Sequence, residues 1–154
     1  MPEPAASGLT ELKIPAQTEF IGLAKRVATS LGGLLGFSLD EIDELSIAVT
    51  QACGSVIEAA DEAWGPGATL KLTFNPTERG VLVDVDAIAP RLREATAPPA
   101  VRRQPAVPAQ QSAELEMQRA LVNEMIRLLV DDFRRQVDTG RRQIRYRMVK
   151  YLVS

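Results

Sequence analysis

Several residue types that common functional sites need are missing or scarce in this sequence of 154 residues. It has no histidine and one cysteine, which excludes an intramolecular disulfide, the usual zinc-ligand sets and Ser-His or Cys-His catalytic pairs. No apolar run approaches the roughly 20 residues of a membrane-spanning helix. The first residues, MPEPAASG, lack the basic and apolar regions of a secretory signal. We therefore expect a cytoplasmic protein with no membrane partner.

The sequence also lacks a large excess of either charge: it has 18 Lys and Arg residues and 20 Asp and Glu residues, for a formal net charge of -2. Non-specific nucleic-acid binding needs many cationic contacts to phosphates, so we expect a protein partner and no direct nucleic-acid partner. With 45% hydrophobic residues, the chain is long enough for one sizeable core. We expect a flexible leader at residues 1–8 and a single domain at residues 9–154.

The first half of the sequence shows five periodic segments. We expect a short strand at 10–15, a helix at 18–35 and a second helix that Ser38 caps and that ends at 65–67. A hairpin follows, in which alternating apolar residues at 70–75 and 81–86 flank a turn at 76–80. The first helix carries one apolar stripe at spacings of three and four residues, made of Phe20, Leu23, Val27, Leu31 and Leu34.

The second half begins with a segment that has no periodic pattern. Residues 89–112 hold five of the ten prolines, four arginines and no glycine, which predicts an extended or disordered linker. A third helix is expected from Glu114 to about Arg134, followed by a hairpin that turns at 138–140. The helix is expected to bury Leu121, Met125, Leu128 and Leu129, with Val122, Ile126 and Phe133 on its flank.

The last strand alternates apolar residues with Arg145 and Arg147, which predicts a cationic face or edge of the sheet. The resulting element order is β, α, α, β, β, linker, α, β, β. It predicts a two-layer α+β sandwich, in which three helices cover one face of a mixed, mostly antiparallel sheet.

The second helix includes the run IDELSIAVTQACGSVIEAA at 42–60. Gln51 and Ser55 lie one turn apart there, on a different face from the apolar stripe. Two polar residues on a partly exposed helix face are common, so the pair has no meaning by itself. The stripe that we expect to be buried consists of Ile42, Leu45, Val49, Ala52, Cys53, Val56 and Ala60.

The element order and three segments resemble the anti-sigma-factor serine kinases of the Bergerat (GHKL) ATPase superfamily. The segments are LKIPAQTEFIGLAKRVATSLG, DELSIAVTQACGSVIEAA and MIRLLVDDFRRQVDTGRRQIRYRMVKYL. The likeness extends from about Leu12 to Leu152. It implies a domain of the histidine-kinase-like ATPase type, in which the linker at 89–112 replaces the ATP lid.

In active members of that family, the second helix carries a catalytic Glu at the position of Gln51 and a magnesium-binding Asn at the position of Ser55. An amide cannot accept a proton as a carboxylate does, and a lone hydroxyl is a poor magnesium ligand. Asp86 occupies the position of the Asp that recognises adenine in that family. Ile88 and Pro90 then occupy glycine positions where the backbone must approach the nucleotide.

The family also has a glycine-rich start to its third helix, where backbone N–H groups hold the phosphates. Here no glycine occurs between Gly80 and Gly140, and Glu114 and Glu116 would repel phosphate. The resemblance therefore implies degenerate ATP and magnesium positions at Ser55 and Asp86, with no catalytic residue, metal site or cofactor. If the pocket still functions, the expected cofactor is ATP with magnesium.

The resemblance implies a regulatory binding protein that sequesters a sigma factor in a partner-switching system, with its kinase activity lost. A STAS-type anti-anti-sigma antagonist would relieve it, and a homodimer is expected. Two alternatives stay open: an active ATP-dependent serine kinase that phosphorylates the antagonist, and a structural dimerisation module without a sigma partner. For Asp86, a charge that protects an edge strand from aggregation is the simpler alternative.

Overall fold

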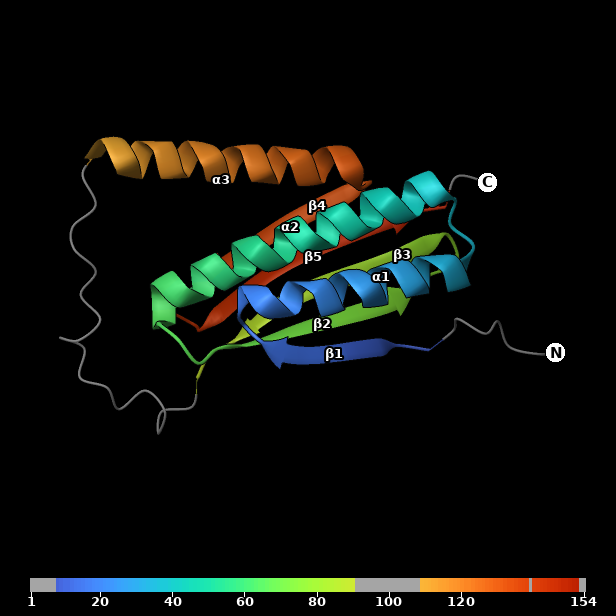
Figure 1. Ribbon diagram of the computed structural model, residues 1–154, viewed down its shortest axis with the longest axis horizontal. Helices are drawn as coiled ribbons and strands as arrows, with labels where there is room; N and C mark the ends of the chain where they lie inside the picture. The colour runs from blue at the N-terminus through green and yellow to red at the C-terminus, as the bar shows by residue number, and fades with distance from the viewer. Residues whose placement is uncertain (1–7, 91–108, 139, 153–154) are drawn as a thin grey trace.

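Five strands form one sheet, and three helices lie in a single layer on one of its faces (Figure 1). The computed structural model describes residues 8–90, 109–138 and 140–152. The leader up to residue 7, linker residues 91–108 and Thr139 lie outside the described residues. In these ranges, no helix is long and apolar enough to cross a bilayer.

The sheet has the strand order β1-β2-β3-β5-β4, and every pairing among the described strands is antiparallel, where a mixed sheet was predicted. The predicted two-layer α+β class is confirmed. The strands are β1 (Thr10–Pro15), β2 (Thr69–Pro76), β3 (Gly80–Ile88), β4 (Asp132–Asp138) and β5 (Gln143–Tyr151). A short 3-10 turn (Thr18–Phe20) precedes α1 (Ile21–Leu35), and the other helices are α2 (Leu39–Trp64) and α3 (Ala109–Leu129).

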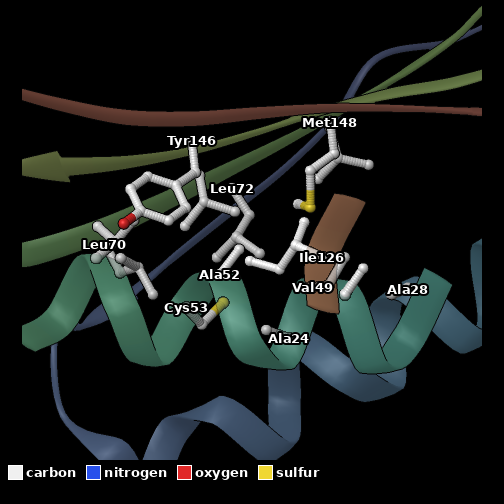
Figure 2. Packing of buried hydrophobic residues seen from close by; sticks show 14 of the residues in the cluster. Ala24, Ala28, Val49, Ala52, Cys53, Leu70, Leu72, Ile126, Tyr146 and Met148 are labelled. Carbon is white, nitrogen blue, oxygen red and sulfur yellow. The ribbon is translucent and has the colours of Figure 1, made fainter. Parts of the chain in front are cut away.

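Helix α2 lies over the centre of the sheet and forms most of the core. The predicted cap is confirmed: the Ser38 hydroxyl accepts a hydrogen bond from the Glu41 backbone N–H, and the Glu41 carboxylate accepts one from Ser38 N–H. Of the predicted stripe, all but the half-buried Ile42 are fully buried. Figure 2 shows α2 residues Ala52 and Cys53 facing Leu72 of the sheet.

The fully buried positions of helix α1 are small residues, whereas the large residues of the predicted stripe are half-buried or exposed. Its buried positions are Ala24, Ala28 and Gly32. A Cβ atom at Gly32 would lie 3.0 Å from Cγ1 of Ile42, so glycine permits the close approach of the two helices. Of the predicted stripe, Phe20, Val27 and Leu31 are half-buried against the core, and Leu23 and Leu34 are exposed.

Helix α3 differs from its predicted form in both its ends and its buried face. It begins at Ala109, inside the predicted linker, and ends at Leu129, because the residues up to Asp138 form the edge strand β4 beside β5. Phe133 therefore lies in β4, where its ring packs edge-on against Tyr146 at 5.4 Å. Among the α3 residues Ile126 alone is buried, and the predicted core residues Leu121, Met125 and Leu128 are exposed.

The hairpin between β4 and β5 is confirmed. The Asp138 side chain accepts a hydrogen bond from the Arg141 backbone N–H at 3.1 Å. Arg142 closes the turn with a φ of 56°, in the left-handed region. The cationic strand is confirmed in part, because Arg145 and Arg147 share one face of the sheet but each is paired with an aspartate of β3.

Candidate functional site

A pocket between α2, α3 and the β4–β5 hairpin contains one of the predicted site residues, Ser55. Its volume is about 180 Å³. Gln51 lies one turn before Ser55 on the same side of α2, outside the lining residues, and both side chains are half-buried. The lining residues are Ser55, Glu58, Ala59, Glu62, Ala63, Arg119, Arg135, Val137 and Tyr146.

Opposite charges cross the pocket from α2 to α3. Arg119 of α3 donates through Nε and Nη2 to Oε1 of Glu58, at 3.1 and 3.0 Å, and through Nη2 to Oε2 of Glu62 at 2.9 Å. The hydrogen bond to Glu58 contributes most to raising the pKa of Arg119 above its ordinary value. All three side chains are partly exposed, so these contacts connect the two helices at a solvated surface.

The wall of the pocket formed by the hairpin carries a second arginine. Arg135 of β4 donates from Nε to the Tyr146 hydroxyl at 3.0 Å, and its guanidinium lies 5.9 Å from the centre of that ring. No acidic partner is recorded for Arg135 among the described residues. The pocket thus combines two carboxylates, two guanidiniums and the hydroxyls of Ser55 and Tyr146.

Asp86, the third predicted site residue, is not part of this pocket. It lies on the sheet face that points away from the helices, where Arg145 donates to Oδ1 at 2.5 Å and to Oδ2 at 3.4 Å. Next to it, Arg147 donates to both Asp84 oxygens at 2.8 and 3.1 Å. These hydrogen bonds are the main reason why the pKa values of both arginines rise above their ordinary values.

The strand register explains this placement. Asp86 lies between Lys71 of β2 and Arg145 of β5, whereas Val85 lies between Leu72 and Tyr146, which face the helices. Because successive residues point to opposite faces, the next residue of β3 on the helix side is Ala87, which is buried. The structure therefore brings Gln51 and Ser55 together on α2 but places Asp86 on the other side of the sheet.

Sequence reasoning missed most of the residues that define the pocket. Glu58 and Glu62 follow Ser55 at spacings of three and seven, so the helical period could have placed them on the same face. Arg119 and Arg135 carry no local signal, because their positions depend on how α3 and β4 dock. In the described part of the chain, no group of three or more acidic or cysteine side chains is arranged to hold a metal ion.

The three-helix layer over an antiparallel sheet is consistent with a sandwich of the GHKL type. No protein-family profile matches the sequence. Serine-protein kinase RsbW of Halalkalibacterium halodurans is 31% identical over 86 residues, which cover 50% of this chain and 51% of that protein. RsbW of Bacillus subtilis is 36% identical over 50 residues, which cover 32% of this chain and 31% of that protein. RsbW of Bacillus licheniformis is 33% identical over 58 residues, which cover 38% of this chain and 36% of that protein.

The chain thus spans about half the length of the first of these relatives and about a third of the other two. The similarities and the fold support the assignment of the chain to the RsbW-like anti-sigma-factor and serine-kinase family.

Proposed function

We propose that this protein is an anti-sigma-factor-like regulator that sequesters a sigma factor by direct contact and no longer binds or hydrolyses ATP. An anti-anti-sigma protein of the STAS type is the proposed antagonist that releases the sigma factor. The family assignment supports the partner classes. The site geometry supports the loss of nucleotide chemistry.

The position of Asp86 is the observation that carries this proposal. A carboxylate that recognises adenine has to face the space between α2 and the sheet, and there β3 presents the methyl group of Ala87. Asp86 is turned to the opposite face and is already bound by Arg145. An alanine offers no hydrogen bond to a base, so the binding energy that would select adenine is missing.

The pocket beside Ser55 supports the same conclusion. Its volume of about 180 Å³ is below the roughly 300–1,000 Å³ of typical small-molecule sites. Glu58 and Glu62 line it and are bound by Arg119, so the two carboxylates offset the two guanidiniums and the pocket has no net positive charge to attract the phosphates of a nucleotide. Gln51 supplies no general base, and Ser55 supplies a single oxygen where magnesium needs several.

The first test measures nucleotide binding and phosphate transfer on the full chain. Titration calorimetry with ATP and magnesium should show no binding up to millimolar nucleotide, and radiolabelled ATP should label no STAS-domain substrate. The matched variant Asp86→Asn removes the carboxylate without changing its size. Micromolar binding by the wild type that Asp86→Asn abolishes would reject the proposal and favour the active kinase.

The second test measures sigma binding. Sigma factors purified from the source organism are added one at a time to the immobilised protein, and each is also tested in transcription with RNA polymerase. We expect one of them to bind and its transcription to be inhibited in proportion to the occupied fraction. Failure of every sigma factor to bind would favour a structural module without a sigma partner.

A further inference from the structure

The pocket beside Ser55 is small, and the formal charges of its lining cancel. Two carboxylates line it, those of Glu58 and Glu62, together with the guanidiniums of Arg119 and Arg135. Its volume of about 180 Å³ equals the share of liquid volume that about six water molecules take. A site of this size and charge suits a small ligand that is itself neutral overall but carries groups of both signs.

One wall of the pocket offers hydrogen-bond donors for a carboxylate. Tyr146 is 3% exposed, on the side of the sheet that faces α2 (Figure 2), and its hydroxyl accepts a hydrogen bond from Nε of Arg135 at 3.0 Å. The Nη groups of Arg135 and the hydroxyl proton of Tyr146 have no acceptor recorded among the described residues. A guanidinium binds a carboxylate more strongly than a neutral oxygen, through two parallel hydrogen bonds. Arg135 and Tyr146 therefore form a position for an anionic group.

The wall formed by α2 offers hydrogen-bond acceptors for an ammonium group. Arg119 binds Oε1 of Glu58 and Oε2 of Glu62. The other oxygen of each carboxylate has no hydrogen bond recorded in the described part of the chain. An ammonium group carries several donors, so it can be shared by two such oxygens. The two glutamates therefore form a position for a cationic group on the same pocket.

The rest of the lining includes small apolar side chains. Ala59 and Ala63 lie one turn apart on α2, and Val137 belongs to β4. Val137 faces the helices because it lies two residues after Arg135 and pairs with the buried Ile144. Small side chains at these positions leave space for a short branched aliphatic group, and burial of that group adds to the affinity.

We propose that this pocket binds a free aliphatic α-amino acid of the size of valine. Its carboxylate binds Arg135 and Tyr146, and its ammonium group binds the glutamates of α2. A zwitterion adds no net charge to a lining that has none, whereas a dicarboxylate or a diamine adds uncompensated charge. The charged side chains of the lining are partly exposed, so water weakens these contacts and we expect a Kd of about 1 mM. The proposal does not depend on sigma binding, which is measured separately.

An NMR titration of the full chain with L-valine tests the proposal residue by residue. The amide shifts should saturate by about 10 mM ligand and gather at the lining residues of α2 and β4. L-valinamide lacks the carboxylate and N-acetyl-L-valine lacks the ammonium group, so each should bind at least about tenfold more weakly. The two compounds also mimic the two ends of a peptide. If either binds as tightly as L-valine, the ligand is a peptide end and the proposal is wrong.

Two neighbouring arginines of β4 give a matched pair of variants. Arg135→Gln removes the guanidinium from the pocket and should raise the Kd for L-valine at least about tenfold. Arg134→Gln removes the same charge from the opposite face of the sheet, where Arg134 lies beside Arg147, and should leave the Kd unchanged. Both residues are exposed, so both variants should fold, which circular dichroism checks. A wild type without saturable shifts, or equal weakening by the two variants, would overturn the proposal.

Discussion

Helices α2 and α3 carry similar apolar periodicity but lie in opposite environments. In α2 the periodic residues form the centre of the core, from Leu45 to Ala60. In α3 most of them face water, and Ile126 is the buried contact. Apolar spacing thus identifies a helix and its face, but the neighbouring surface decides whether this face meets the core of the same chain.

The two helices differ in burial because the residues that contact other elements are small and apolar in α2 but include large polar side chains in α3. Ala48 and Ala52 let α2 approach its neighbours closely, and the sheet presents large side chains toward it (Figure 2). The inner face of α3 instead includes Arg119 and Asn123, whose amide oxygen is buried without a recorded hydrogen-bond partner. A buried polar atom of this kind costs about 1–3 kcal/mol, so α3 is held less firmly than α2.

Truncation of one leucine on each helix tests this contrast most strongly. Leu45→Ala on α2 should lower the free energy of unfolding by about 2–5 kcal/mol, because it opens a cavity at a side chain that is 1% exposed. Leu121→Ala on α3 should change it by less than about 0.5 kcal/mol, because that side chain is 64% exposed. Urea denaturation of both variants measures this, and equal losses would show that α3 is packed like α2.

Substitution of the buried Lys150 of β5 should give the next largest change in the free energy of unfolding, because this side chain links the two helices. It donates to Glu44 of α2 and to the Leu129 carbonyl at the end of α3. Lys150→Met should cost about 1–2 kcal/mol by leaving that carbonyl unpaired, and hydrogen exchange of the last turn of α3 should accelerate. Lys71→Met, which removes an exposed pair with Glu11, is the control and should cost less than about 0.5 kcal/mol. Equal losses would mean that Lys150 does not hold α3.

Alkaline pH gives the smallest effect, at Cys53 in the core face of α2. Burial raises the pKa of this thiol to about 12 from 9.0, so above pH 9 the unfolded state gains stability by releasing the proton. Stability should therefore be full below pH 9 and fall as the pH rises toward 12. Between pH 8 and pH 10 the wild type should lose about 1.4 kcal/mol more than Cys53→Ala. If stability fell with pH equally steeply in the wild type and in Cys53→Ala, water would have to reach this face of α2.

Much of the fold could be predicted from the sequence because it depends on local signals. The strand at 10–15, the Ser38 cap and the hairpin at 70–86 follow from alternation, capping chemistry and turn residues. The end of the third helix could not be predicted in this way. Phe133 continues the helical spacing, but it pairs with Met148 in the sheet, and a pairing between distant segments leaves no local trace.

The site was harder to predict than the fold. The alternation of β3 already placed Asp86 on the face opposite Val81, Val83 and Val85, so its separation from Ser55 could have been read from the period of two. The ion pairs of Arg119 could not, because they depend on the docking of α3. Gly32 also shows this limit: its close contact with Ile42 is a property of two packed helices, not of either sequence segment.

The central claim is that this protein retains the fold but has lost nucleotide binding. Thermal unfolding with and without ATP and magnesium at several millimolar tests it most directly, because any ligand that binds the native state alone raises its stability. The account predicts an unchanged Tm. A rise corresponding to about 2.7 kcal/mol, as expected when ligand exceeds its Kd a hundredfold, would contradict it.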